Sequence, residues 1–365
     1  MKIKAIVTTD KKTFSLKDVN LSEPKDNEVL VKIIASGVCH TDATVIDKTI
    51  PVPYPVVLGH EGSGIVTKVG KGVTTVKEGD HVVLGFSYCG HCENCLEGKA
   101  GACEIMMQLN FSGVNERGES PISNEDGSQI SQFFGQSSFS TYTTVNEKNV
   151  VKVPKEVDLK YLGPLGCGIM SGSGSVFNSL KPRVGSSIVI FGTGAVGLSA
   201  LMAAKVSGCS PIIAVDIHDH RLELAKEFGA THTINSKFDN VVEKIKEFTE
   251  GKGSHFSFET TGINTVSKQA IDCLRVYGTM GTVAVGKKNI ELNLTNDIVT
   301  RCITIKGIVE GDATPQKQIP ILVNLFKSGQ FALDKMVEFY KPEEIEKAFE
   351  DSAKGKTIKP IIIFE

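Results

Sequence analysis

The sequence predicts an α/β protein of two domains, one rich in strands and one built on a parallel sheet wrapped by helices. The chain has 365 residues, more than a single hydrophobic core usually organises. Its first roughly 150 residues contain short apolar runs bounded by glycine or aspartate, a pattern typical of strands. From about residue 185, buried strands alternate with helical patterns, which indicates a doubly wound parallel sheet.

The strand-rich part is predicted from alternation and from turn signals. Val29, Val31 and Ile33 alternate with other residues, as in a strand with one buried face. Short apolar runs follow at 64–69 and 81–84. Glycine-rich stretches after and before these runs predict tight turns between consecutive strands.

The second part begins with a continuous apolar run at 187–191, as expected for a strand buried on both faces. The elements expected after it are helices over 195–206, 221–228 and 241–248, and strands over 211–215, 256–259 and 279–285. Beyond about residue 305 we expect two helices that each begin at a proline and end at a glycine, Pro315 to Gly329 and Pro342 to Gly355.

The composition is that of an ordinary soluble globular protein, with 41% hydrophobic and 22% charged residues. A net charge of -2 gives no electrostatic attraction to nucleic acid or to an anionic membrane. The start of the chain has no apolar signal segment, and no stretch approaches the ~18 apolar residues of a membrane span. We therefore expect a cytoplasmic protein with no nucleic-acid or membrane partner.

Four cysteines in one short run predict a structural zinc site. Cys89, Cys92, Cys95 and Cys103 stand in CGHCENCLEGKAGAC, within a lobe of about residues 86–105. Four thiolates fill a tetrahedral zinc completely, which leaves no position for a substrate. The alternative is a pair of disulfides, but cysteines two residues apart rarely meet disulfide geometry.

A glycine-rich turn predicts a dinucleotide site of the Rossmann type. The run GTGAVG directly follows the buried strand at 187–191 and opens the next helix. Gly192 permits the tight turn, Gly194 lets a pyrophosphate approach the backbone, and Gly197 lets helix and strand pack closely. We expect Val196, in the first helical turn, to lie at the same site, where free N–H groups bind the phosphates.

An acidic residue at the end of the next strand indicates NAD. Asp216 would accept hydrogen bonds from the ribose hydroxyls and repel a 2′-phosphate. Ile217 follows it where an NADP site usually has arginine or a small residue. Arg221 offers some charge to a phosphate, so NADP stays the alternative. The other interpretation of the run is packing glycines with an aspartate strand cap.

Cys39, His60 and Cys167 are further candidates, but spacing alone does not unite residues so far apart. The stretch GHEGSGIVTKVGKGVTTVKEGDHV, the four-cysteine lobe, Gly-Cys-Gly and GTGAVG occur in this order. With these motifs the chain resembles the zinc-dependent medium-chain alcohol dehydrogenases essentially from end to end. The resemblance implies a catalytic zinc on Cys39, His60 and Cys167, with the fourth position open for water or alcohol.

The resemblance also implies roles for neighbouring residues. Asp42 matches the carboxylate that orients the zinc-binding histidine. Glu61 matches a glutamate behind the metal, and Thr41 matches the hydroxyl that takes the alcohol proton. The implied reaction oxidises an alcohol to an aldehyde with hydride transfer to NAD, with two zinc ions per subunit.

The chain departs from well-studied relatives at three positions. Thr44 stands where animal liver enzymes have a histidine at the outer end of the proton relay, so protons must leave another way. His40 is the nearest titratable candidate, and it stands where many relatives place an arginine against the pyrophosphate. Lys359 takes the place of a pyrophosphate-contacting arginine, with the charge but without the bidentate fork.

Several stretches, among them VPYPVVLGHEGSG and FFGQSSFSTY, look most like bacterial aryl-alcohol (benzyl-alcohol) dehydrogenases. By position, Phe133, Phe134 and Val309 are expected to line the substrate pocket, where aromatic walls suit a flat ring. Allylic terpenoid or other primary alcohols would fit the same wall. A non-catalytic zinc and NAD(H)-binding protein of this fold is the alternative from another class. It is disfavoured because the implied ligands and Thr41 are all present.

The family implies a GroES-like β-barrel domain from residues 1–170 and 306–365, and a Rossmann domain from 171–305. The active site would lie in the cleft between them. Relatives are dimers or tetramers, and dimers usually continue one Rossmann sheet into the other. We expect this to occur across the strand near residues 279–285.

Overall fold

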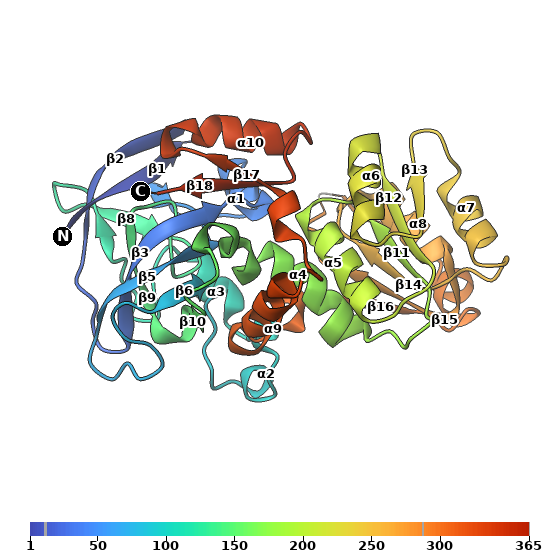
Figure 1. Cartoon of the computed structure of the whole chain (residues 1–365), viewed down its shortest axis with the longest axis horizontal. Helices are drawn as coiled ribbons and strands as arrows, with labels where there is room; N and C mark the ends of the chain where they lie inside the picture. The colour runs from blue at the N-terminus through green and yellow to red at the C-terminus, as the bar shows by residue number, and fades with distance from the viewer. Residues whose placement is uncertain (11–12, 287, 365) are drawn as a thin grey trace. The chain divides into compact units, whose positions relative to one another are not determined.

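The computed structural model of the chain describes residues 1–10, 13–286 and 288–364. The chain divides into two compact units, which are described separately below (Figure 1). The first unit comprises Met1–Cys167, Thr314–Ser328 and Ala332–Glu365, and the second comprises Gly168–Ala313 and Gly329–Phe331.

A closed barrel of five strands, in the order β1-β2-β7-β8-β4, forms one part of the first unit. The strands are β1 (Lys2–Asp10), β2 (Thr13–Leu21), β4 (Val56–Val57), β7 (Ile122–Ser123) and β8 (Gln129–Gln132). Near the start of β1, Lys2 and Lys4 are exposed whereas Ile3 and Ala5 are buried. This alternation is what a strand with one face in a barrel core requires.

A seven-stranded sheet forms the other part of the first unit, in the order β10-β6-β5-β3-β18-β17, with β9 paired to β3. The strands are β3 (Glu28–Gly37), β5 (Gly62–Val69), β6 (His81–Leu84), β9 (Tyr142–Asn146), β10 (Val150–Val153), β17 (Val337–Tyr340) and β18 (Lys359–Ile363). The strands predicted around 29–33, 64–69 and 81–84 are thus confirmed. Because β18 pairs antiparallel with β3, the end of the chain lies beside the segment that leads to Cys39.

Among the described residues of the first unit there are five α-helices, and the sequence predicted two of them. They are α1 (His40–Ile46), α2 (Glu93–Leu96), α3 (Met106–Phe111), α9 (Pro315–Lys327) and α10 (Ile345–Ala353). Both proline-initiated helices are confirmed as α9 and as α10 with its preceding 3₁₀ turn η9 (Pro342–Glu344). The three short helices α1, α2 and α3 lie in the part that was predicted as strands alone.

The second unit is built on a six-stranded parallel sheet in the order β13-β12-β11-β14-β15-β16 (Figure 1, yellow-green to orange). Its strands are β11 (Ile188–Phe191), β12 (Ile212–Asp216), β13 (His232–Asn235), β14 (Ser254–Glu259), β15 (Leu274–Thr282) and β16 (Thr304–Gly307). Its α-helices are α4 (Gly168–Gly174), α5 (Ala195–Val206), α6 (Asp219–Phe228), α7 (Val241–Phe248) and α8 (Asn264–Asp272). The predicted α/β class with a doubly wound parallel sheet is confirmed.

Helices cover both faces of this sheet. Val189 and Phe191 of β11 pack with Ile245 of α7 and Ala270 of α8 in one apolar core. Because side chains alternate along a strand, the other residues of β11 face the opposite side, where α5 packs on β11 and β12. The carboxyl ends of β11 and β14 lie side by side at the point where the strand order reverses, which is where such sheets bind ligands.

Two details of the second unit differ from expectation. Residues 306–313 belong to it, because β16 pairs with β15 at the edge of its sheet. The strand expected at a dimer interface, near 279–285, is β15, which pairs with β14 on one side and β16 on the other. It therefore has no open edge, and β16 is the outer strand. In the described part of the chain, no helix combines the length and apolarity needed to cross a membrane.

Candidate active site

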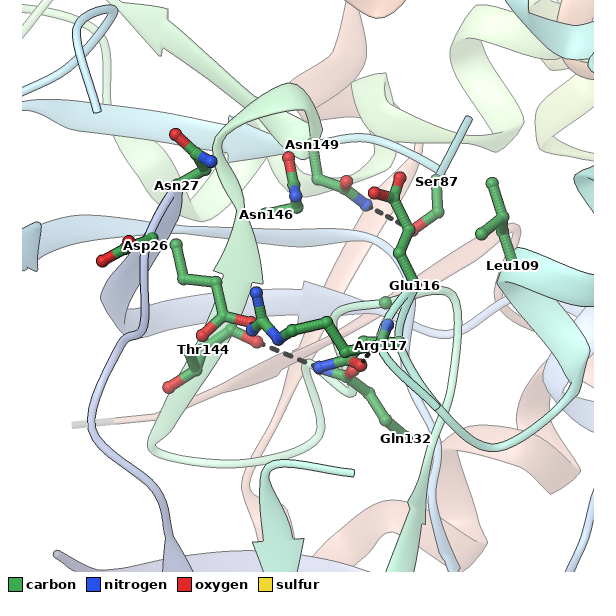
Figure 2. A pocket seen from close by; sticks show the side chains of 13 residues that line it. Asp26, Asn27, Ser87, Leu109, Glu116, Arg117, Gln132, Thr144, Asn146 and Asn149 are labelled. Atoms are coloured by element: carbon green, nitrogen blue, oxygen red, sulfur yellow. Dashed lines mark hydrogen bonds and ion pairs between the residues drawn. The ribbon is translucent and has the colours of Figure 1, made fainter. Parts of the chain in front are cut away.

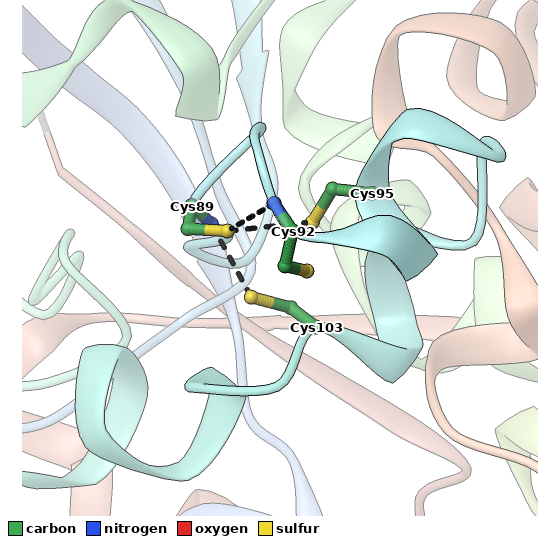
Figure 3. Close-up of side chains that lie close together, drawn as sticks. All are labelled: Cys89, Cys92, Cys95 and Cys103. Atoms are coloured by element: carbon green, nitrogen blue, oxygen red, sulfur yellow. Dashed lines mark hydrogen bonds between the residues drawn. The ribbon is translucent and has the colours of Figure 1, made fainter.

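The four cysteines of the predicted lobe gather at one point (Figure 3). The sulfur atoms of Cys89, Cys92, Cys95 and Cys103 all lie within 4.8 Å of one another. Sulfurs bound tetrahedrally to zinc at about 2.3 Å stand roughly 3.8 Å apart, so the cluster has the size of such a site. None of the nine cysteines, all of which the structure describes, is in a disulfide, so no such bond competes for these four.

Backbone turns bring the four thiols together. Gly90 and Gly98 have φ of 80°, the left-handed conformation that glycine adopts without strain. The Cys92 N–H donates to Cys89 Sγ at 3.3 Å. Backbone N–H groups, first that of Glu104, lower the pKa of Cys92 to about 6, whereas burial raises the pKa of Cys95 to about 12. A bound cation is therefore needed to hold all four as thiolates.

A second cluster unites residues that are distant in the sequence. The ligand atoms of Cys39, His60, Glu61 and Cys167 lie within 4.8 Å of one another. Cys39 follows β3 and precedes α1, His60 and Glu61 lead into β5, and Cys167 follows a 3₁₀ turn, η4 (Gly163–Gly166). All four residues belong to the first unit.

Asp42 holds His60 in one orientation. Its Oδ1 lies 3.2 Å from His60 Nδ1 and accepts a hydrogen bond from the Gly59 N–H, while Oδ2 accepts one from the Cys39 N–H. His60 Nε2 is buried and has no hydrogen-bond partner among the described residues. A buried nitrogen without a partner costs free energy, and next to two thiols it is the donor that a zinc ion would use.

The electrostatics of this cluster favour the thiolate form of Cys39. The hydrogen bond with Cys167, together with the nearby charges of His60 and Lys359, holds the pKa of Cys39 well below its usual range despite burial. Burial alone would lower the pKa of His60, but the Asp42 carboxylate and the Cys39 thiolate raise it well above its usual value. The donor set itself, two thiols and one imidazole within 4.8 Å of one another, fits a zinc ion with an open fourth position.

Lys359, expected from the sequence at a pyrophosphate, is bound to Glu61 and Val38 within the first unit. Its side chain is 3% exposed, and its ammonium donates to both carboxylate oxygens of Glu61 at 2.8 and 2.9 Å and to the Val38 carbonyl at 3.0 Å. All three N–H donors are thus used inside the first unit. Burial raises the pKa of Glu61 to about 7 against the opposing charge of Lys359. Lys359 therefore holds the Glu61 carboxylate in place next to Cys39, His60 and Cys167.

Aromatic rings pack directly against His60. The Phe134 ring stacks on the imidazole with centroids 4.5 Å apart, and the Phe133 ring meets it edge-on at 5.3 Å. Phe111 at the end of α3 contacts both rings, at 5.8 and 5.1 Å. Together these three phenylalanines form the aromatic wall of the cluster. Sequence reasoning named Phe133 and Phe134 but missed Phe111, which carries no motif.

The residues expected to handle protons lie on α1. The Thr41 hydroxyl is 3.7 Å from Cys39 Sγ, next to the candidate metal position. The Thr44 hydroxyl is buried and donates to the Thr41 carbonyl at 2.8 Å, so it does not extend a chain from the Thr41 hydroxyl. His40, the first residue of α1, is exposed to solvent.

In the second unit, the glycine-rich turn has the geometry that a dinucleotide needs. Gly192 has φ of 88°, and a Cβ there would lie 2.5 Å from Thr260 Oγ1. A Cβ at Gly197 would lie 1.8 Å from the Gly192 carbonyl oxygen. The close packing of α5 on the turn after β11 therefore requires glycine at position 197. Gly194, before α5, has nothing within 4 Å of the position a Cβ would take, which leaves room for a phosphate.

Asp216, at the end of β12, reaches back to this turn. Its Oδ2 accepts from the Thr193 N–H at 2.7 Å and from the Thr193 hydroxyl at 2.8 Å. Its Oδ1 accepts from the N–H groups of Ile217 and His218. Burial would raise the pKa of Asp216, but these hydrogen bonds hold it below its usual value. Thr193, at a variable position of the motif, was missed by sequence reasoning.

Comparisons with known proteins agree across both units. The family model described as alcohol dehydrogenase GroES-like domain matches residues 25–155, and the one described as zinc-binding dehydrogenase matches residues 195–328. The chain is 41% identical to the geraniol dehydrogenase of Castellaniella defragrans over 353 residues, 96% of this chain and 94% of that protein. The chain belongs to the zinc-dependent medium-chain alcohol dehydrogenases.

Two further relatives of this alcohol dehydrogenase bear on its substrate. The crystal structure of benzyl alcohol dehydrogenase from Acinetobacter calcoaceticus is 46% identical, with a TM-score of 0.96 and 100% of both chains covered. S-(hydroxymethyl)glutathione dehydrogenase of Paracoccus denitrificans is 33% identical over 363 residues, 97% of each chain. The predicted GroES-like barrel and the predicted Rossmann sheet are both confirmed for the dehydrogenase.

The remaining predicted residues of the alcohol dehydrogenase lie in its second unit. Val309 precedes the 3₁₀ turn η7 (Glu310–Asp312) and is 48% exposed. Val196 is half-buried in the first turn of α5, and Ile217 is 46% exposed. Arg221 lies on α6, and its buried Nε has no hydrogen-bond partner among the residues described.

Replacing Asp216 with glycine should relax the preference for NAD that the sequence predicts. The variant loses a carboxylate that would repel a 2′-phosphate and that anchors Thr193. We expect the ratio of kcat/KM for NAD over NADP to fall at least tenfold, about 1.4 kcal/mol. Asp219→Ala is the matched control, because Asp219 is a carboxylate on the neighbouring helix α6 that binds Asn235 instead. An unchanged ratio in Asp216→Gly would remove Asp216 from this role.

Proposed function

We propose that this alcohol dehydrogenase oxidises a bulky primary alcohol bearing an aromatic ring to its aldehyde, reversibly, with NAD as hydride acceptor. The observation that carries the proposal is the aromatic wall of Phe111, Phe133 and Phe134 packed against His60. A flat ring held near the His60 cluster gains offset or edge-on contacts with such a wall. The similarity to a benzyl alcohol dehydrogenase supports this substrate class.

Cys39, His60 and Cys167 are proposed to hold the catalytic zinc, and the four lobe cysteines a structural one. When bound, the catalytic zinc acidifies an alcohol hydroxyl and the nicotinamide accepts the hydride. Three protein donors leave one position for the substrate oxygen. In the lobe, four thiols leave none, so that metal stabilises the fold.

The polar residues around His60 would orient the site and move the proton. Asp42 keeps the Nδ1 proton of His60 in place, so that Nε2 is the free donor atom. The Thr41 hydroxyl, 3.7 Å from Cys39 Sγ, is positioned to take the proton of the alcohol. Since Thr44 is engaged with the backbone, solvent-exposed His40 is proposed as the group that passes the proton to water.

The glycine-rich turn and Asp216 are proposed to bind NAD, with Gly192, Gly194, Val196 and Gly197 around the phosphates. Thr193 would keep the Asp216 carboxylate ionised and oriented toward the ribose. We further propose a cytoplasmic homodimer or homotetramer, with β16 as the strand available for pairing between subunits.

A second candidate substrate is an allylic terpenoid alcohol. The 41% identity to a geraniol dehydrogenase favours it, and an apolar aromatic wall also accepts a branched alkene. The chemistry at the hydroxyl would be the same for both candidates. The two proposals therefore differ only in the shape of the group that packs against Phe133 and Phe134.

The substrate proposal is tested by kcat/KM for benzyl alcohol, geraniol and ethanol, followed as NADH formation. We expect benzyl alcohol to exceed ethanol about 100-fold, or roughly 2.7 kcal/mol of transition-state binding. A higher value for geraniol would select the terpenoid candidate, and a preference for ethanol would reject both.

A pair of matched variants asks whether the wall causes this preference. Phe134→Leu removes the ring that stacks on His60 and should lower the benzyl alcohol to ethanol ratio about tenfold, or ~1.4 kcal/mol. Phe139→Leu removes a buried ring of the same segment that packs on Phe349 instead, and should leave the ratio unchanged. Equal ratios in the two variants would exclude the wall as the cause.

A further inference from the structure

A polar cavity of about 120 Å³ lies behind the aromatic wall (Figure 2). It is lined by Ser87 at the start of the four-cysteine lobe, by Leu109 of α3, by Gly135 directly after Phe134, and by Gln132 and Asn149. Figure 2 shows the Asn149 side chain pointing at Ser87. The cavity therefore marks the place where the lobe, α3 and the segment that carries the wall meet.

Asn110 joins these three segments. Its side chain, 1% exposed, accepts from the Ser87 N–H at 2.9 Å and donates to the Ser87 carbonyl at 2.9 Å. The same amide donates to the Met106 carbonyl at 2.8 Å, within α3. The Asn110 carbonyl accepts from the Phe134 N–H at 3.0 Å. Asn110 thus binds Ser87, at the start of the lobe, through its side chain, and it binds Phe134 of the aromatic wall through its backbone carbonyl.

The backbone of the aromatic wall is strained at Phe134, so contacts from neighbouring residues are required to hold it in this conformation. Phe134 has φ of 52°, a conformation that is unfavourable for a bulky side chain and persists only where the surroundings impose it. Gly135 follows with φ of 61°, and a Cβ there would lie 2.2 Å from Ser87 Oγ. The turn that holds the Phe134 ring against His60 therefore packs closely on Ser87, at the start of the lobe.

Asn149 and Ser87, which line the cavity, form further contacts with the backbone of Phe134. Asn149 Nδ2 donates to Ser87 Oγ at 2.8 Å and lies 3.5 Å from the Phe134 carbonyl. The Ser87 hydroxyl in turn donates to the Phe134 carbonyl at 3.4 Å. Both the N–H and the C=O of Phe134 are thus tied to residues that contact the lobe entry.

We propose that Asn110 is a positioning residue that couples the four-cysteine lobe to the aromatic wall, so that the lobe sets where the Phe134 ring lies. The consequence for substrate choice rests on the proposed function, whereas the coupling itself does not. The lobe then acts on the alcohol pocket through Ser87, Asn110 and Phe134, in addition to stabilising the first unit.

The test is hydrogen–deuterium exchange of the zinc-loaded protein, read on the peptide that contains residues 133–137. Asn110→Ala should speed exchange of this peptide at least about tenfold. The variant keeps the backbone carbonyl that accepts from the Phe134 N–H, but it loses the side-chain bonds to Ser87 that hold this carbonyl in place. Asn94→Ala is the matched control, since the Asn94 side chain also ties the lobe together, by donating to the Ala102 carbonyl within it. Unchanged exchange in Asn110→Ala, or equal changes in both variants, would overturn the proposal.

If Asn110→Ala does not fold, Ser87→Ala is the variant to measure. Ser87→Ala keeps the backbone contacts of residue 87 to Asn110 and loses only the hydroxyl. Ser87→Ala should also speed exchange of the peptide that contains residues 133–137. An unchanged exchange rate of this peptide would overturn the proposed coupling. In the folded variants, the benzyl alcohol to ethanol ratio should fall about tenfold while zinc content stays constant. A merely stabilising role would lower the melting temperature and leave this ratio unmoved. If the wild-type protein shows no ring preference, the proposed substrate fails while the exchange result still decides the coupling.

Discussion

Replacing Cys167 with alanine is expected to abolish alcohol-dependent NADH formation and to remove one zinc ion per chain. The Cys167 sulfur lies within 4.8 Å of the ligand atoms of Cys39, His60 and Glu61. Because Cys167 is only 5% exposed, a ligand from solvent does not easily replace its thiolate. Losing one of three metal donors should reduce kcat/KM at least 1,000-fold, about 4 kcal/mol of transition-state stabilisation. Initial rates and zinc content by plasma mass spectrometry check this.

Cys209→Ala is the matched control for this variant. Cys209 is also a buried free cysteine, but it belongs to neither cluster in the described part of the chain. We expect it to retain both zinc ions and nearly full activity, at a modest cost in stability. Full activity in Cys167→Ala would reject Cys167 as a ligand of the reactive metal.

Replacing Cys103 with alanine should mainly lower the thermal stability of the protein. Its sulfur accepts the Cys89 N–H, and its loss leaves three donors for the metal that joins the two ends of the lobe. Losing a metal site of this kind costs on the order of 4 kcal/mol. For a domain of 150–250 residues this lowers the melting temperature by about 10 °C. Thermal unfolding and zinc content measured together check the prediction.

Cys302→Ala serves as the control here, because Cys302 is exposed and lies outside both clusters among the residues described. It should leave both the melting temperature and the zinc content unchanged. A Cys103→Ala protein with an unaltered melting temperature and both zinc ions would show that the lobe does not need the fourth thiol.

The regular part of the fold was predictable because its elements carry periodic patterns. The helix expected over 195–206 is α5 (Ala195–Val206), and the strand expected over 187–191 is β11 (Ile188–Phe191). By contrast, α1 (His40–Ile46) has seven residues, too few to form from propensity alone. It depends on the Asp42 carboxylate that accepts from the Cys39 N–H, a contact made by the site itself.

The boundary near residue 306 was misplaced for a similar reason. Residues 306–313 follow the second unit through β16 and a run of left-handed residues, Glu310, Gly311 and Asp312, with φ between 47° and 67°. Gly311 packs against α4 so closely that a Cβ would lie 2.5 Å from the Met170 carbonyl oxygen. Such tight tertiary contacts leave no periodic pattern in the sequence.

The candidate site was predictable residue by residue only where a motif exists. Cys39, His60 and Cys167 were united by resemblance, and the structure brings them together. For Lys359 the sequence position suggested a phosphate contact and gave no sign of an ion pair with Glu61. Only tertiary structure shows that β18 places its ammonium on Glu61. Phe111, Thr193 and Asn110 were missed, since each acts through a contact formed only in the folded chain.

The most direct test of the proposed zinc-dependent oxidation is to follow NADH formation from benzyl alcohol while zinc is removed and restored. We predict no measurable rate in zinc-depleted protein, and recovery of the full rate as the zinc content returns to two ions per chain. Recovery should fail in Cys167→Ala, whose four-cysteine lobe is intact. A full rate in wild-type protein stripped of zinc would contradict a metal-dependent reaction at Cys39, His60 and Cys167.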